Sequence, residues 1–111
     1  MAAVTEYAAI VRRILSEYAA FKPSVGDIAA ELICDEPGGH YELMQLGWIG
    51  PRRIHGSVIH VDIRGDKVWI QHDGTERGIA SELVAAGIPR DHIVLGFHPP
   101  YKRPDTQFAT G

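Results

Sequence analysis

Histidine and aspartate side chains recur along two neighbouring segments of the chain and are the first candidates for chemistry. His60 and Asp62 are two residues apart, and His72 and Asp73 follow shortly afterwards. Residues two apart on a strand point to the same face, so an imidazole and a carboxylate would lie side by side. Such a pair can act as a base with its orienting group, supply two metal ligands, or form hydrogen bonds within a surface.

A metal site needs more ligands than this pattern brings together. Zinc, nickel and iron sites use three or four protein ligands at about 2 Å. The hairpin register given below places His72 on the face opposite His60, so that only His60 and Asp62 converge. The other four histidines show neither His-x-x-x-His nor His-Glu-x-x-His spacing. We therefore predict no metal ion and no other cofactor.

The sequence also lacks the motifs of hydrolases and nucleotide-binding enzymes. No serine lies in a Gly-x-Ser-x-Gly segment, and no phosphate-binding loop is present. Cys34 is the single cysteine, so an intrachain disulfide is excluded. We predict no catalytic residue. A small enzyme or ligand-binding protein that uses His60, Asp62, Trp69 and Gln71 remains the alternative.

The hydrophobic pattern predicts a single α+β domain over residues 1–111. An amphipathic helix is expected at 3–21, strands at 28–34, 41–48, 53–63 and 67–72, a second helix at about 76–86 and a short strand at about 93–97. Strands separated by Gly/Pro turns indicate a mainly antiparallel four-stranded meander, with the first helix packed on it. Three prolines between positions 98 and 104 predict an extended C-terminal tail.

The Gly65-Asp66 pair is typical of a two-residue hairpin turn, and it fixes the register of the two flanking strands. Arg64 is then opposite Lys67, and His60 is opposite Gln71. Alternation of side chains assigns one face to the core, namely Ile59, Val61, Ile63, Val68 and Ile70. The opposite, mixed face carries Val58, His60, Asp62, Trp69 and Gln71.

The mixed face has the composition of a protein–protein interface, because an aromatic side chain is surrounded by hydrogen-bonding groups. The C-terminal tail adds Tyr101, Lys102 and Arg103. The candidate interaction surface therefore comprises His60, Asp62, Trp69, Gln71, Tyr101, Lys102 and Arg103. The alternative is that the C-terminal segment covers Trp69. An uncovered mixed face leads us to expect a homodimer.

Composition and charge narrow the class of protein further. The 111 residues carry a formal net charge of −3, and tight binding of nucleic acid usually requires a basic domain. Two short basic pairs, Arg52-Arg53 and Lys102-Arg103, are the candidates for phosphate contacts, and each has only two charges, so direct nucleic-acid binding is expected to be weak or absent. No segment has the pattern of a signal peptide or a membrane span, and we expect a cytoplasmic protein.

Several longer stretches carry a resemblance to a known family. They are Gly47-Trp48, Arg52-Arg53-Ile54-His55-Gly56, His60-Val61-Asp62-Ile63, the run from Lys67 to Glu76, Gly78-Ile79-Ala80, Gly87-Ile88-Pro89, the run from Ile93 to His98, and Phe108-Ala109-Thr110-Gly111. With the N-terminal helix, these stretches resemble the XisI-like family, the fdxN element excision controlling factors of cyanobacteria. The resemblance extends over essentially the whole chain.

This resemblance implies an accessory protein rather than an enzyme. Members act with a partner called XisH and a site-specific recombinase when a DNA element is excised during heterocyst development, and the recombinase performs the strand chemistry. The family provides no catalytic residue to carry over. The resemblance therefore implies a controlling factor that docks on a XisH-like protein or on the recombinase complex.

Overall fold

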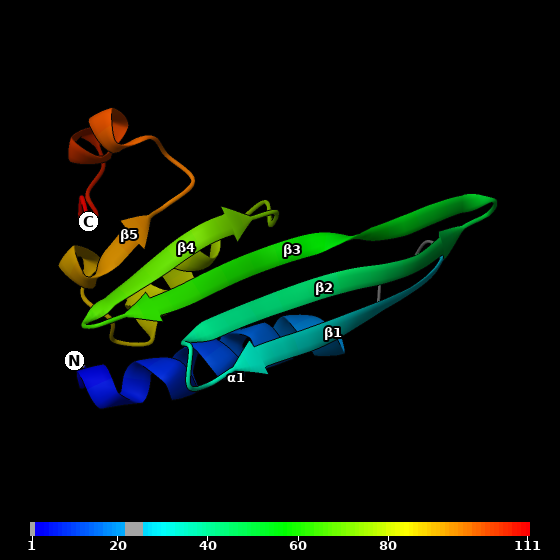
Figure 1. The fold of residues 1–111 in the computed structure, drawn as a ribbon, viewed down its shortest axis with the longest axis horizontal. Coiled ribbons are helices and arrows are strands. Elements are labelled where there is room, and N and C mark those ends of the chain that lie inside the picture. Colours follow the sequence, from blue (N-terminus) through cyan, green and yellow to red (C-terminus); the bar gives the residue numbers. More distant parts are fainter. Residues whose placement is uncertain (1, 22–25) are drawn as a thin grey trace.

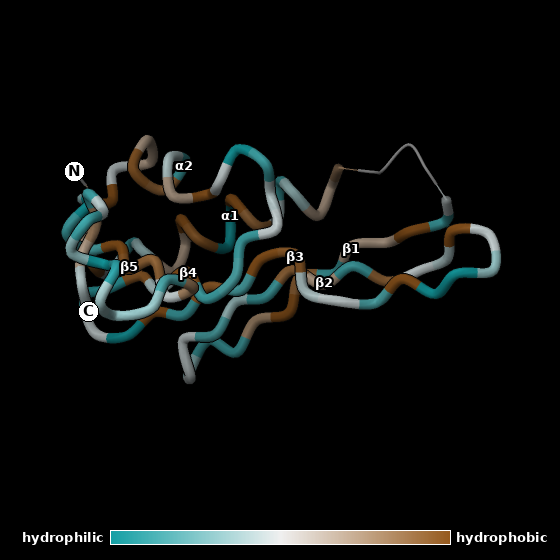
Figure 2. The backbone as a smooth tube through the Cα atoms, turned by 90° about the horizontal axis from the view of Figure 1, so that it is seen from above, coloured by the Kyte–Doolittle hydropathy of each residue, from teal (hydrophilic) through white to brown (hydrophobic). Residues whose placement is uncertain are grey.

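The computed structural model, which describes residues 2–21 and 26–111, consists of one sheet with its α-helices on one face (Figures 1 and 2). The helices are α1 (Tyr7–Ala20) and α2 (Ile79–Ala85), and the strands are β1 (Asp27–Asp35), β2 (His40–Ile49), β3 (Arg52–Arg64), β4 (Lys67–Asp73) and β5 (Ile93–Leu95). Short 3-10 segments are η1 (Val4–Glu6), η2 (Arg90–His92) and η3 (Pro100–Asp105). No helix among these residues is long and apolar enough to cross a membrane.

The sheet confirms the predicted α+β class and the antiparallel meander. Strands β1 to β4 are each antiparallel to the next, in chain order. The short segment at 93–95 is a fifth strand, and it pairs with β4 in parallel. A parallel neighbour needs a crossover connection, and the chain through α2 provides it. The sheet is therefore mixed and has five strands rather than four.

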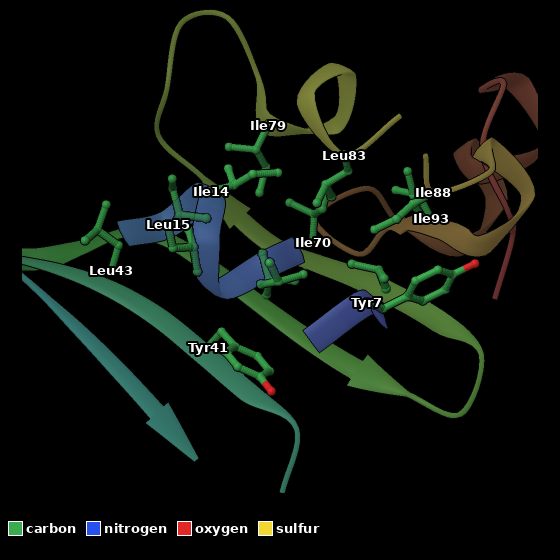
Figure 3. Packing of buried hydrophobic residues seen from close by; sticks show 14 residues of the cluster. Tyr7, Ile14, Leu15, Tyr41, Leu43, Ile70, Ile79, Leu83, Ile88 and Ile93 are labelled. Atoms are coloured by element: carbon green, nitrogen blue, oxygen red, sulfur yellow. The ribbon is translucent and has the colours of Figure 1, made fainter. Parts of the chain in front are cut away.

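The hydrophobic core lies between the helices and one face of the sheet (Figure 3). Helix α1 contributes the buried residues Tyr7, Val11, Ile14 and Leu15, which recur at helical spacing and pack on β1, β2 and β3. Helix α2 contributes Ile79 and Leu83. The sheet residues facing them include Tyr41, Leu43, Ile59, Val61, Val68 and Ile70. The predicted core face of the β3–β4 hairpin is confirmed.

The register of the β3–β4 hairpin is as predicted near its turn and shifts further along. Arg64 pairs with Lys67, and the predicted pairing continues as far as Val61 with Ile70. A β-bulge then follows, so that His60 pairs with His72. The predicted pairing of His60 with Gln71 was wrong, because Gln71 is the extra residue of the bulge. The prediction that His72 lies on the face opposite His60 was wrong for the same reason, since the two residues pair.

A second bulge corrects the face assigned to Val58. Between β2 and β3, Leu43 pairs with Ile59 but Met44 pairs with Ser57, so β3 has one extra residue at Val58. Val58 packs against the core cluster and not on the mixed face. A strict two-residue alternation cannot anticipate this, since a bulge places an additional side chain outside the alternation.

Helix α2 begins at Ile79 rather than at 76, because side chains hold the preceding residues in a turn. The Asp73 carboxylate accepts hydrogen bonds from the N–H and hydroxyl of Thr75 at 2.9 and 2.5 Å, and from the N–H of Ile79 at 2.8 Å. Gly78 has a φ of +83°. Left-handed backbone of this kind is compatible with glycine and not with a helix interior.

The proline-rich tail is not extended as predicted. Pro100–Asp105 form the 3-10 segment η3. The N–H of Lys102 donates to the carbonyl of Pro99 at 2.9 Å, and the hydroxyl of Thr106 donates to the carbonyl of Arg103 at 2.8 Å. Proline at the first position of a helical turn is tolerated, because it lacks only an N–H that would have no helical partner.

Candidate functional site: the open face of the sheet

The sheet face turned away from α1 and α2 carries the predicted polar residues, and we call it the open face. Alternation along the strands and the cross-strand pairs assign its members, which include Ile33, His40, Glu42, Met44, Leu46, Trp48, Arg53, His55, His60, Asp62, Arg64, Trp69 and Gln71. Among the described residues, no α-helix covers this face (Figure 2). The face therefore presents side chains from four neighbouring strands to solvent.

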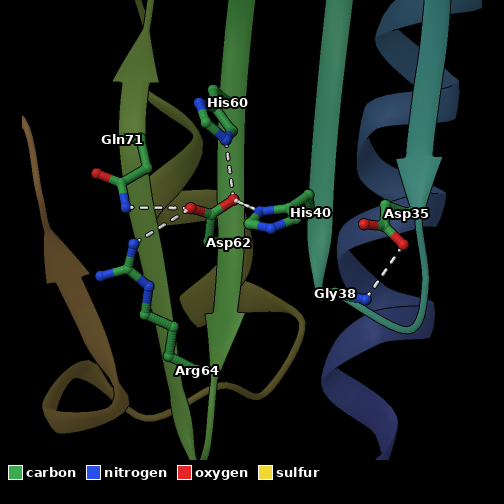
Figure 4. Close-up of polar contacts among 7 residues, drawn as sticks. All are labelled: Asp35, Gly38, His40, His60, Asp62, Arg64 and Gln71. Atoms are coloured by element: carbon green, nitrogen blue, oxygen red, sulfur yellow. Dashed lines mark hydrogen bonds and ion pairs between the residues drawn. The ribbon is translucent and has the colours of Figure 1, made fainter.

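Asp62 is the centre of a hydrogen-bonded group on this face (Figure 4). Its side chain is only 5% exposed. One carboxylate oxygen, Oδ1, lies 2.8 Å from His40 Nδ1 and 2.8 Å from His60 Nε2. The other oxygen, Oδ2, accepts a hydrogen bond of 3.2 Å from Gln71 Nε2 and lies 3.7 Å from the Arg64 guanidinium. We call these five residues the Asp62 cluster.

The cluster brings together three of the predicted site residues, His60, Asp62 and Gln71. It also contains His40, which directly precedes the strand predicted at 41–48 and was not among the predicted site residues. The bulge in β3 is what places His40 opposite Asp62. Gln71 is the extra residue of the bulge between β3 and β4, and its amide reaches the Asp62 carboxylate from β4.

The sequence contains a signal that would have found His40. The tight turn pairs Ile49 with Arg52, an odd-numbered residue with an even-numbered one. The core-facing residues of both strands are odd-numbered, such as Leu43 and Ile59. Residues that pair must share a face, so the register has to shift by one between the turn and the core. That shift moves the partner of His40 from position 61 to Asp62.

Opposing effects set the charge state of the cluster. Burial would raise the pKa of the Asp62 carboxyl, but the hydrogen bond from His40, the charge of His60 and the hydrogen bonds from Gln71 and His60 together lower it. The hydrogen bond to Asp62 and the negative charge of Asp62 raise the pKa of His40. The neighbouring Asp35 raises it further, while desolvation and Arg64 act in the opposite direction. The cluster therefore favours a carboxylate beside a protonated His40.

Trp69 lies beside the cluster, and the C-terminal segment covers part of it. The guanidinium carbons of Arg64 and Arg103 lie 5.0 and 5.2 Å from its ring centroid, within the range of cation–π contacts. A Cβ atom on Gly96 would stand 3.2 Å from Trp69 Cε3, so the chain passes close to the indole. The alternative that the C-terminal segment covers Trp69 is confirmed in this respect.

The tail residues of the candidate surface differ in their surroundings. Arg103 is half-buried, since its Nε donates to the carbonyl of His98 at 3.1 Å and its guanidinium stacks on Trp69. Tyr101 is 76% exposed, and Lys102 is exposed. Arg103 therefore belongs with Trp69, whereas Tyr101 and Lys102 face solvent on η3.

Two exposed apolar residues of the open face were not among the predicted site residues. Ile33 on β1 is 52% exposed and Trp48 on β2 is 48% exposed. Trp48 lies opposite Arg53, whose guanidinium carbon is 5.4 Å from the indole ring. Ile33 follows the inward-facing Leu32, and Trp48 follows Gly47, so alternation along each strand places both residues on the open face. This alternation is the sequence signal that could have identified them.

The geometry gives little support to a ligand-binding pocket at His60. One hollow in the described part of the chain lies between α1 and α2, where Tyr18, Phe21 and Glu82 line it and His60 does not. In that same part of the chain, His40 and His60 are hydrogen bonded to Asp62 and to no serine, threonine or cysteine side chain. The arrangement thus resembles a stable polar centre more than a nucleophile with its base.

The two basic pairs considered for nucleic-acid binding lie far apart. Arg52 and Arg53 follow the β2–β3 turn at one end of the sheet, whereas Lys102 and Arg103 lie on η3 near the other end (Figure 1). The longest dimension of the molecule is 43 Å. In addition, Arg53 and Arg103 stack on tryptophans. The four residues do not form one continuous basic patch.

Comparison with known proteins identifies relatives across the whole chain. The family model described as XisI protein matches residues 1–110. The crystal structure of a XisI-like protein from Anabaena variabilis is 40% identical, has a TM-score of 0.90, and covers 98% of this chain and 100% of its own. The crystal structure of the fdxN element excision controlling factor XisI from the same organism is 34% identical, with a TM-score of 0.82 and coverage of 97% and 98%. No curated protein matches the chain.

Proposed function

We propose that this chain, which belongs to the XisI family, is a non-catalytic accessory factor that docks on other proteins during the excision of a DNA element. The relative from Anabaena variabilis named as an fdxN element excision controlling factor supports the excision role, because the two chains match over nearly their full lengths. The partner in this proposal is a XisH-like protein, and the assembled pair acts beside a site-specific recombinase.

The exposed apolar groups of the open face are the observation that carries the docking part of the proposal. Trp48 and Ile33 are each about half exposed on the same side of the sheet. Apolar side chains set among polar groups are the usual anchors of protein interfaces, and tryptophan and tyrosine are prominent among them. Tyr101 provides a further exposed aromatic group on η3.

The Asp62 cluster supports this role as a rigid part of the same face, close to Ile33, because Ile33 pairs with Glu42 and Glu42 pairs with His60. Its hydrogen bonds connect β2, β3 and β4 across the open face. Interface groups that are held in place before binding lose less conformational freedom when the complex forms. The charge balance also favours a protein partner over DNA, since the chain carries a net charge of −3 and its basic pairs are separated.

Affinity measurements on exposed aromatic residues test the proposal. The full chain is titrated with the XisH-like protein of the same genome, using Trp48→Ala and Tyr101→Ala as variants. Phe21→Ala is the matched control, because Phe21 is 75% exposed at the end of α1, on the helix side of the sheet. An anchor residue contributes about 2 kcal/mol or more, so Trp48→Ala should weaken binding roughly thirtyfold.

Other outcomes would count against the proposal. If both variants bind the partner as tightly as the natural chain, the open face is not the docking surface. If instead the free chain binds duplex DNA tightly at physiological salt, and Arg52→Ala with Arg53→Ala abolishes that binding, direct DNA recognition replaces docking. Sedimentation of the free chain tests the expected homodimer in the same samples.

A further inference from the structure

We propose that His40, His60 and Asp62 form a binding site for one divalent transition-metal ion of the zinc class. The proposal does not depend on the proposed docking function. It starts from the convergence of three side chains that the sequence alone did not bring together. One potential ligand atom from each residue lies within 4.8 Å of the other two.

The donor set determines which ion the site would bind. Two imidazole nitrogens and one carboxylate oxygen suit zinc and its neighbours among the first-row metals. Calcium prefers six to eight oxygen ligands and magnesium prefers octahedral oxygen coordination, so neither fits two imidazoles. Three protein ligands leave a fourth zinc position for water or for a group from another molecule.

The distances are close to those of a tetrahedral site. Ligand atoms bound to one zinc ion at about 2.1 Å lie roughly 3.4 Å from each other. Both imidazole nitrogens are 2.8 Å from Asp62 Oδ1, as expected for direct hydrogen bonds. The centroids of the two imidazole rings are 6.5 Å apart, and the close-up shows both rings directed at the Asp62 carboxylate (Figure 4). If each imidazole nitrogen moves about half an ångström away from Asp62 Oδ1, the ion has room to bind between them.

The surroundings combine a fixed ligand with movable ones. The Asp62 side chain is 5% exposed, whereas those of His40 and His60 are 54% and 34% exposed. The buried carboxylate is thus held in place, and the imidazoles can adjust and admit an ion from solvent. Gln71 donates to Asp62 Oδ2, which is the kind of outer contact that orients a metal-binding carboxylate.

Arg64 is the feature that opposes metal binding, because its positive charge lies near the site. Its guanidinium is 3.7 Å from Asp62 Oδ2 and its side chain is 58% exposed. The guanidinium also stacks on Trp69. It therefore occupies the Oδ2 side of the carboxylate, while the two histidines occupy the Oδ1 side. Solvent screens an exposed charge of this kind, so the Oδ1 side remains available to a cation.

The test uses the full chain without an affinity tag, freed of metal by a chelator and then dialysed. Calorimetric titration with Zn²⁺ should give one ion per chain. His40→Asn and His60→Asn should each weaken binding at least about tenfold. His55→Asn is the matched control, since His55 is an exposed histidine on the same strand, opposite Leu46 and outside the cluster. Its affinity for Zn²⁺ should equal that of the natural chain.

X-ray absorption of the zinc-loaded chain gives a second, independent readout that also serves if a variant folds poorly. The expected spectrum has two imidazole ligands and further oxygen ligands at about 2 Å. The proposal is overturned if Zn²⁺ does not bind one-to-one, if His40→Asn and His60→Asn leave the affinity unchanged, or if the spectrum contains fewer than two imidazoles.

Discussion

The Nδ1 atom of His40 lies 2.8 Å from Oδ1 of Asp62, although 22 residues separate the two in sequence. The contact joins the first residue of β2 to the third-last residue of β3. It depends on the bulge that shifts the register between these strands by one residue. A local irregularity in the backbone thus determines which polar side chains meet on the open face.

Replacing Asp62 by asparagine should destabilise the fold. In Asp62→Asn an amide nitrogen replaces one carboxylate oxygen and faces donors, because Gln71 Nε2 and Arg64 both approach Oδ2. A buried donor without an acceptor costs about 1–3 kcal/mol in the free energy of unfolding. Urea denaturation at pH 7 measures the loss. Asp105→Asn, at an exposed aspartate of η3, is the control and should stay within about 0.5 kcal/mol.

The contribution of His40 to stability should fall as the pH rises. The pKa of His40 is raised above its ordinary value of 6.5 in the folded chain, chiefly by the hydrogen bond to Asp62 and its charge. Its contribution is therefore fully present below about pH 6.5 and is lost as the pH rises through the folded pKa. Asp62 has a pKa lowered from 3.8, so its contribution is present above about pH 3.8 and is lost as the pH falls through the lower, folded value.

Urea denaturation between pH 5 and pH 9, with a chelator present, checks this dependence. The stability difference between the natural chain and His40→Asn should shrink toward the alkaline end. A difference that stays constant over the whole range would show that His40 does not titrate against Asp62.

A core substitution and an open-face substitution of the same residue type should have different effects. Ile70 is fully buried on β4 among residues of α1 and α2, and Ile70→Ala should lower the free energy of unfolding by about 2–5 kcal/mol. Ile33 is 52% exposed, and Ile33→Ala should cost less than about 1 kcal/mol. Thermal denaturation of the two variants compares them directly. Equal losses would mean that Ile33 packs against another part of the fold.

Removing the Arg103 side chain should expose Trp69 to water. The Arg103 guanidinium stacks on the indole, and its Nε fixes the tail through the carbonyl of His98. In a Trp48→Phe background, where Trp69 is the single tryptophan, Arg103→Ala should shift the fluorescence to longer wavelength and increase quenching by acrylamide. Lys102→Ala is the control and should leave both unchanged. Identical spectra for the two variants would contradict the stacking.

The sequence predicts those features of the fold that are set locally. The stripe of Val11, Ile14 and Leu15 has helical spacing, and the Gly65-Asp66 turn aligns its neighbours from Arg64 to Val61. In both cases the residues that determine the local structure lie within a few positions of it in the sequence. The core face of the hairpin, and the shared face of His60 and Asp62, follow from the same local rules.

The remaining features depend on contacts between distant parts of the chain, or on a choice between local conformations that the residues favour equally. The parallel pairing of β5 with β4 is set by the path through α2 and not by the three residues of the strand. Proline near −65° in φ is compatible with both polyproline and 3-10 geometry, which differ in ψ, so composition alone did not distinguish η3 from an extended tail. The two bulges moved His40 into the cluster and Val58 into the core.

Amide hydrogen exchange of the chain, alone and bound to the XisH-like protein, tests the docking proposal most directly. The account predicts slower exchange in the complex for the outer part of β2 and β3 around Trp48, and for η3 around Tyr101. The exposed surfaces of α1 and α2 should exchange as in the free chain. Protection confined to α1 and α2, with unchanged exchange around Trp48 and Tyr101, would contradict docking through the open face.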